Sequence, residues 1–143
     1  MAFFYPKLRT LLYTISKEIG AFVTHSLKSS ADEKITISKI KQDAKVRIDQ
    51  ITGVELKRVI LENGAVVHAL KKEDHHLMRD DFKKIGRIIN STTDISLQPK
   101  KHRNNQVLLF KEQKDNGLQI LMEIRPKKQN LALLTMYRQK KAK

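Results

Sequence analysis

The chain has 143 residues, which is long enough for one domain with a modest core. It has no cysteine, so it cannot form disulfides or thiolate metal sites. Its 29 Lys and Arg against 15 Asp and Glu give a formal net charge of +14, which favours nucleic acid as a partner and, second, an acidic membrane surface or acidic protein. Aromatic residues are only 6% of the chain, too few for a surface that stacks single-stranded bases, and no apolar run approaches the ~20 residues of a membrane span.

The first predicted element is an amphipathic helix over residues 6–28. Apolar side chains recur there at spacings of three and four, and Pro6 suits a first helical turn because its missing N–H is not needed. Polar residues interrupt the apolar ones every few positions, so we interpret this stretch as structure rather than as a signal peptide.

A second helix is predicted over about residues 36–51, where isoleucines and an alanine form one stripe. The segment KSSADEK before it is typical of a turn, in which Ser30 or Asp32 caps the element that follows. Gly53 stands at the position of a C-terminal stop. The two helices either pack into the core as a hairpin, the commoner fate, or form a coiled-coil arm for dimerisation.

The middle of the chain predicts one strand and two helices. Residues 56–64 carry β-branched side chains and end in Asn-Gly, which indicates a strand followed by a turn. A short helix is expected over residues 65–73, and an amphipathic helix over residues 80–90 that starts at Asp80 or Asp81. The predicted buried face of the latter consists of Phe82, Ile85, Ile88 and Ile89.

The last third of the chain predicts an antiparallel meander. Residues 91–105 form a loop with at most one short strand. Two apolar runs, at residues 106–113 and 118–126, are joined by a hairpin turn built on Asn-Gly, and residues 131–139 form a third strand. Helices followed by a meander indicate an α+β fold.

Histidines concentrate in residues 66–78, VVHALKKEDHHLM, which hold three of the five in the chain. His75 and His76 are adjacent, so they diverge on a helix or a strand, and no HExxH spacing occurs; we therefore expect no metal site. The sequence also lacks a GxSxG nucleophile elbow, a glycine-rich phosphate loop and a cluster of acids that suits two metal ions. No cofactor is expected.

Metal-independent RNA cleavage is compatible with the residues that remain. It needs a group that accepts the 2′-OH proton, a group that protonates the leaving 5′ oxygen, and cations that balance the charge on phosphorus. The candidates are His68, Lys71, Lys72 and His75 in one stretch, and Thr135, Tyr137 and Arg138 near the end. His68 and Lys72 are four apart and share a helix face, and Thr135 and Tyr137 share a strand face. Each of these residues also fits a plain surface or core-edge role.

The order of these segments resembles a known group of nucleases. The chain resembles the phage-associated barnase–EndoU–colicin–RelE-like nuclease domains in the succession of AVVHALKKEDHH, DDFKKIGRIINSTTDI and the strands NQVLLFKE, LQILMEIRP and LALLTMYR. The resemblance covers about residues 54–140. It implies a nuclease domain over residues 54–143, with helices packed on a curved antiparallel sheet and an RNase-like site on the sheet face. Residues 1–53 form a separate helical segment in this interpretation.

The resemblance also implies a set of site residues. It matches His68 and His75 to the two family histidines, Lys72 to the basic position after the first, and Thr135, Tyr137 and Arg138 to the signature of the last strand. The stretch KKEDHH is longer than the family pattern, which makes His76 the substitute for His75. We therefore predict His68, Lys72, His75, Thr135 and Tyr137 as catalytic, and Lys71, Arg138, Lys101 and Arg103 as substrate contacts, the last two from the basic loop KKHRNN.

The leading hypothesis is a metal-independent endoribonuclease-like domain, phage- or toxin-related, that acts in the cytoplasm of its own cell or of a target cell. RNA is the expected partner, a toxin-like nuclease also calls for an inhibitor protein, and no membrane insertion is expected. One alternative is a non-catalytic basic nucleic-acid-binding protein of the same fold. Another is an interaction module that forms a homo-oligomer through its N-terminal helices. Composition alone does not separate these hypotheses.

Overall fold

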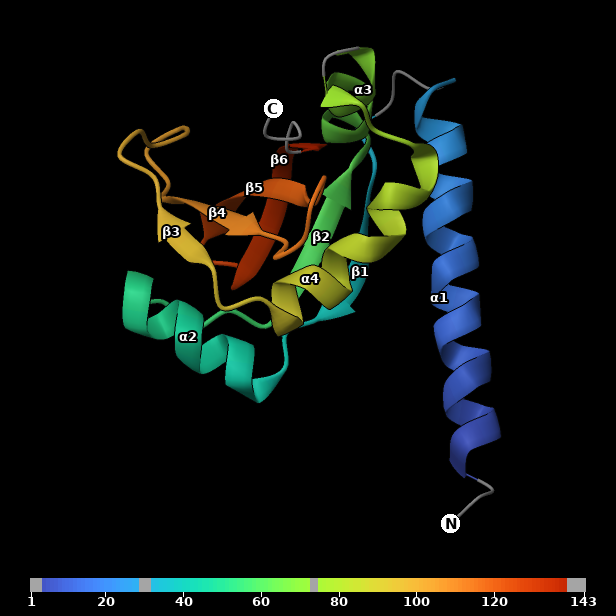
Figure 1. The fold of residues 1–143 in the computed structure, drawn as a ribbon, viewed down its shortest axis with the longest axis horizontal. Helices are drawn as coiled ribbons and strands as arrows, with labels where there is room; N and C mark the ends of the chain where they lie inside the picture. The colour runs from blue at the N-terminus through green and yellow to red at the C-terminus, as the bar shows by residue number, and fades with distance from the viewer. Residues whose placement is uncertain (1–3, 29–31, 73–74, 139–143) are drawn as a thin grey trace.

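The computed structural model describes residues 4–28, 32–72 and 75–138, and it has the predicted α+β class (Figure 1). Six strands of this part of the chain form one sheet in the order β1-β2-β6-β5-β4-β3. The strands are β1 Lys34–Lys39, β2 Arg58–Glu62, β3 Ile95–Leu97, β4 Val107–Lys111, β5 Leu118–Arg125 and β6 Asn130–Arg138. The helices are α1 Phe4–Ser26, α2 Gln42–Thr52, α3 Asn63–Lys71, the 3-10 helix η2 Arg79–Lys84 and α4 Ile85–Ser91.

The long helix α1 confirms the first predicted helix. Its C-terminal part packs on α3 and η2, and Ile19, Phe22 and Val23 are buried there. In Figure 1 it runs along one side of the domain. No helix among the described residues combines the length and the apolar character that a membrane span requires.

Strand β1 corrects the second predicted helix, which was placed from residue 36 onward. Ile35 and Ile37 alternate with the polar Lys34 and Thr36, which is the two-residue period of a strand. β1 pairs antiparallel with β2, so it belongs to the sheet. The prediction of a helix was wrong here because Ile37 also falls on the helical stripe of the residues that follow.

Helix α2 confirms the remaining part of that predicted helix. It begins at Gln42 and ends at Gly53, whose φ of 72° is left-handed and whose N–H donates to the Asp49 carbonyl at 2.7 Å. Asp32 precedes a strand, so it caps no helix. Ser30, the other predicted cap, lies outside the described residues.

The two predicted helices of the middle region are present with altered ends. The Asn63-Gly64 step begins α3 instead of forming a turn. The helix predicted over residues 80–90 is divided into η2 and α4, although its predicted apolar face is buried. α4 lies close to β1: a Cβ added at Gly86 would stand 2.7 Å from the Ser38 Cβ, so glycine permits this approach.

The sheet is mixed rather than purely antiparallel. β4, β5 and β6 form the predicted meander, and β3, the one short strand that the prediction allowed in the preceding loop, pairs with β4. β6, however, also pairs with β2, in parallel, so the last strand in chain order lies in the middle of the sheet. This pairing joins the β1–β2 hairpin to the meander.

The two faces of the sheet differ in character. One face packs against the helices and forms the main core, to which β5 contributes Ile120, Met122 and Ile124 and β6 contributes Leu131, Leu133 and Met136. The opposite side, which carries the alternate residues of β5, is called the outer face below. Those residues are Gln119, Leu121, Glu123 and Arg125. Polar and charged side chains thus gather on the outer face.

Candidate active site

A bulge in β6 brings Thr135 and Tyr137 to the outer face. Leu133 and Thr135 pair with consecutive residues of β5, so Leu134 between them is an extra residue. Because side chains alternate along a strand, one extra residue moves every later side chain to the opposite face. Thr135 and Tyr137 therefore share the outer face, as predicted for this pair, while Met136 lies in the core.

His75, Gln119, Thr135 and Tyr137 form what we call the reactive cluster. The Tyr137 hydroxyl donates to the Gln119 Oε1 at 3.0 Å, across the β5–β6 pair. The His75 imidazole lies against the Tyr137 ring, with 5.8 Å between the ring centroids and 48° between their planes. His75 Nδ1 and Thr135 Oγ1 are buried and have no hydrogen-bond partner in the described part of the chain. A buried polar atom without a partner costs about 1–3 kcal/mol, so a group that reached these two atoms would gain by supplying the missing bonds.

The structure separates the two adjacent histidines. The backbone N–H of His75 donates to the Lys72 carbonyl at 3.0 Å, and the His75 ring contacts Tyr137 of the last strand. His76 is exposed, adopts a left-handed φ of 53°, and makes no ring contact within the described ranges. Of the alternatives left open by the sequence, His75 is the one that lies beside Tyr137.

Five other predicted residues are exposed, and one of them, Arg103, is paired with Glu123. His68 and Lys71 lie on α3, and Lys101 lies in the loop between β3 and β4. Lys72 follows the end of α3 in extended backbone, with φ −89° and ψ 106°, so the prediction that His68 and Lys72 share a helix face is wrong. The His68 side chain makes no hydrogen bond, ion pair or ring contact to any residue that the structure describes. Their roles stay predictions.

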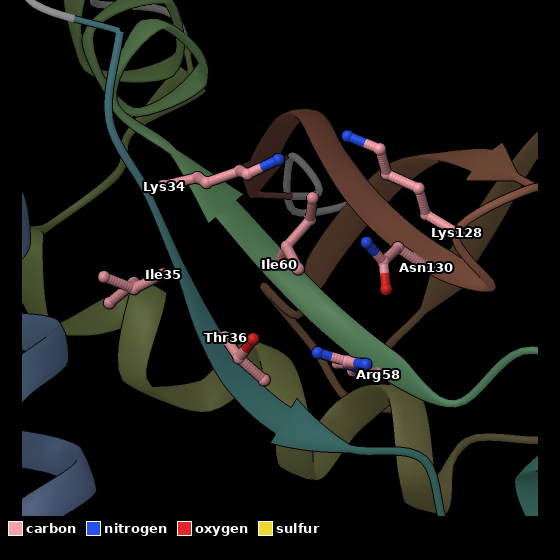
Figure 2. A pocket seen from close by; sticks show the side chains of 7 residues that line it. All are labelled: Lys34, Ile35, Thr36, Arg58, Ile60, Lys128 and Asn130. Carbon is pink, nitrogen blue, oxygen red and sulfur yellow. The ribbon is translucent and has the colours of Figure 1, made fainter.

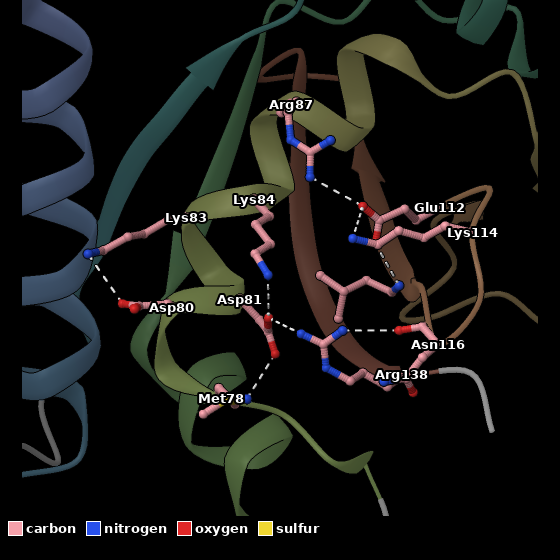
Figure 3. A network of polar contacts seen from close by, with 11 residues as sticks. Met78, Asp80, Asp81, Lys83, Lys84, Arg87, Glu112, Lys114, Asn116 and Arg138 are labelled. Atoms are coloured by element: carbon pink, nitrogen blue, oxygen red, sulfur yellow. Dashed lines mark hydrogen bonds and ion pairs between the residues drawn. The ribbon is translucent and has the colours of Figure 1, made fainter. Parts of the chain in front are cut away.

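Arg138 has partners within the protein. Its guanidinium pairs with Asp81 and donates to the Asn116 carbonyl at 3.0 Å (Figure 3). The Asp81 side chain is only 2% exposed; it also accepts the Met78 N–H at 2.8 Å and pairs with Lys84 at 3.2 Å. We call these contacts the Asp81 network.

Two residues of the Asp81 network are close in sequence to residues of the reactive cluster. Met78 follows His75 by three residues, and Arg138 directly follows Tyr137. Asp81 binds both Met78 and Arg138, so it holds the segment that carries His75 against the strand that carries Tyr137. Sequence reasoning assigned Asp81 only as a helix start, because its long-range partner is 57 residues away.

Glu123 is a buried carboxylate on the outer face that sequence reasoning missed. Its side chain is 1% exposed and accepts hydrogen bonds from Arg103 at 3.2 Å, Asn105 at 3.1 Å and Arg125 at 3.0 Å. Burial alone raises the pKa of this carboxyl. The hydrogen bonds from Asn105 and Arg125 and the charges of Arg125 and Arg103 lower the pKa by more than burial raises it, so it lies below its ordinary 4.5. Arg125 pairs further with Glu62 at 2.6 Å. The sequence feature that could have indicated this buried carboxylate is the single acid within the apolar run LQILMEIRP.

Replacing Glu123 by glutamine is expected to lower the free energy of unfolding by about 2–3 kcal/mol at neutral pH, because buried bonds to charged groups are weakened. A carboxyl whose pKa is lower in the folded state than in the unfolded state stabilises the fold fully at a pH above its unfolded pKa, near 4.5. That contribution disappears as the pH falls through the pKa of the folded state. The difference between wild type and Glu123→Gln should therefore shrink in acid. Urea unfolding across this range measures it, with exposed Glu55→Gln as the control; a pH-independent difference would contradict the argument.

A basic pocket of about 490 Å³ lies on the outer face, over β1, β2 and β6 (Figure 2). It is lined by Lys34, Ile35, Thr36, Arg58, Ile60, Lys128 and Asn130. Two neighbouring pockets share Lys34 with it and also include Glu62 and Arg103, and one of the two includes Glu123 as well. Among the described residues, no three His, Asp or Glu side chains gather as ligands for one metal ion.

A comparison with protein families identifies the domain. The family model described as phage-Barnase-EndoU-ColicinE5/D-RelE like nuclease3 matches residues 33–143. The match begins just before β1, so it includes β1 and α2 as well as residues 54–140, on which the resemblance was based. No curated protein and no solved structure gives a significant match. The chain belongs to the phage-Barnase-EndoU-ColicinE5/D-RelE like nuclease3 family.

Proposed function

We propose that this nuclease domain cleaves RNA by transesterification, without a metal ion. The observation that carries the proposal is the contact between His75 and Tyr137. The Thr135 hydroxyl beside them has no hydrogen-bond partner among the described residues, and the same sheet face holds the cations of the basic pocket. These groups match the requirements of the reaction: a proton acceptor, a proton donor and positive charge for the phosphate. The net charge of +14 supports a polyanionic substrate.

Each residue has a role in the proposed step. The His75 imidazole accepts the proton of the ribose 2′-OH as the 2′ oxygen attacks the adjacent phosphorus. The bond from phosphorus to the 5′ oxygen breaks, and the Tyr137 hydroxyl protonates the leaving oxygen before solvent restores both groups. The Thr135 hydroxyl donates to a non-bridging phosphate oxygen, and Lys71 and Lys72 balance the developing charge. The products are a 2′,3′-cyclic phosphate and a 5′-OH end.

The products of cleavage test this proposal. The purified chain is incubated with a short RNA in excess EDTA, beside a DNA of the same sequence. We expect RNA fragments with 2′,3′-cyclic phosphate and 5′-OH ends, and intact DNA, because DNA has no 2′ nucleophile. Fragments with 5′-phosphate ends, cleavage of the DNA, or loss of activity in EDTA would contradict the mechanism. Retention of intact RNA with a steep salt dependence would favour the non-catalytic binding protein instead.

A further inference from the structure

Three cations reach the basic pocket from separate segments. Lys34 lies on β1, Arg58 on β2 and Lys128 in the turn between β5 and β6. Figure 2 shows the side chains of Lys34 and Lys128 extending toward one another. The pocket lining contains no Asp or Glu, and none of the three cations has an ion-pair partner among the described residues. An anion bound between them would relieve their mutual repulsion.

The adjoining surface provides a contrast. Arg103 and Arg125, on the same face, are paired with Glu123, and Arg125 is paired with Glu62 as well. Their charges are balanced within the fold. Positive charge is therefore left unbalanced in the basic pocket rather than spread evenly over the outer face.

Asn130 adds a second, independent feature to the pocket. It is 8% exposed, and its side-chain oxygen is buried and has no hydrogen-bond partner within the described residues. A buried acceptor left unpaired is unfavourable, and an N–H or O–H group of a ligand would satisfy it. The pocket thus offers cations that can bind a phosphate and, beside them, an acceptor that can bind an N–H or O–H group. A nucleotide carries both, because its phosphate is anionic and its base and ribose carry hydrogen-bond donors.

We propose that the basic pocket binds one nucleotide of the RNA, with the phosphate held by Lys34, Arg58 and Lys128 and a base or ribose donor held by Asn130. The inference rests on the proposed function, since it takes RNA as the ligand. Asn130 and Tyr137 are near opposite ends of β6, about 20 Å apart along the strand. The pocket is therefore a subsite away from the bond that is cut, and it determines how the RNA lies across the outer face.

Binding of small ligands to the full chain tests the subsite. Calorimetric titration compares AMP, UMP, ribose 5-phosphate and inorganic phosphate. We expect the nucleotides to bind more tightly than inorganic phosphate, and Lys128→Ala to weaken their binding by about tenfold through loss of a charge-assisted contact. Asn130→Ala should remove the preference for nucleotides over phosphate. Ribose 5-phosphate shows whether the donor belongs to the ribose or to the base.

The control is Lys45→Ala, which removes a half-buried cation from α2, a helix that contributes no residue to the pocket lining. Nucleotide binding should be unchanged in it. Equal weakening by Lys45→Ala, equal affinity for phosphate and nucleotides, or no nucleotide binding would overturn the proposal. Lys128 lies in an exposed turn, so its loss does not threaten folding. Because no bond is cut, nucleotide binding without RNA cleavage would reject the proposed function alone, and cleavage without nucleotide binding would reject the subsite alone.

Discussion

Replacing His75 by glutamine should slow RNA cleavage by about 10²–10⁴-fold, the range that general acid–base groups contribute. Glutamine keeps a polar side chain of similar length but cannot take up a proton near neutral pH. The His75 ring lies against Tyr137, and its Nδ1 is buried without a hydrogen-bond partner in the part of the chain that the structure describes. In the proposed mechanism it is therefore the histidine best placed to exchange a proton with the RNA. The rate is measured as kcat/KM on a short RNA, together with the thermal stability of the variant.

The adjacent histidine is a matched control for this change. His76→Gln alters the same chemistry one residue away, at an exposed position without a ring contact. Its cleavage rate should stay close to that of wild type. If His76→Gln or His68→Gln is as damaging as His75→Gln, the assignment of His75 fails. Tyr137→Phe, which keeps the ring but loses the hydroxyl bonded to Gln119, separates the proton donor from the ring contact.

Replacing Asp81 by alanine is expected to lower the free energy of unfolding by about 3–5 kcal/mol, as is typical when one partner of a buried ion pair is removed. The Arg138 side chain is 15% exposed and would keep its charge without its carboxylate. The Met78 N–H would lose its acceptor and Lys84 its partner. Because Asp81 connects the segments of His75 and Tyr137, cleavage should fall as well.

Urea unfolding measures this loss, and the neighbouring acid provides the control. Asp80 has a side chain that is 82% exposed and pairs only with Lys83 among the described residues, so Asp80→Ala should change stability little. Asp81→Asn should lie between the two, because an amide oxygen still accepts the Met78 N–H. Equal effects of Asp80→Ala and Asp81→Ala would show that the buried network does not stabilise the fold.

Local signals explain why much of the fold could be predicted from the sequence. The Asn-Gly turn between β4 and β5 and the apolar runs on either side of it identify a hairpin without any distant information. The apolar face around Phe82 and Ile85 likewise repeats within a few residues. The pair of Thr135 and Tyr137 follows from strand alternation, and both lie on one face of β6.

What could not be predicted depends on distant partners. The isoleucines near Ile37 fit a strand and a helix equally, and only pairing with β2 decides between them. The bulge at Leu134 has no turn residue to mark it, although it decides which face carries Tyr137. The partners of Asp81 and Glu123 come together only in the folded sheet, so neither carboxylate could be predicted to take part in these contacts.

The central place of β6 has a consequence for how the protein is made. β1 and β2 can pair early, and β3, β4 and β5 can pair among themselves, but these two parts of the sheet meet only through β6. Long-range strand pairing is a slow step in folding. During synthesis, residues 130–138, which include Thr135 and Tyr137, must therefore leave the ribosome before the two parts of the sheet can join. The contact between His75 and Tyr137 can therefore form only after β6 has joined the sheet.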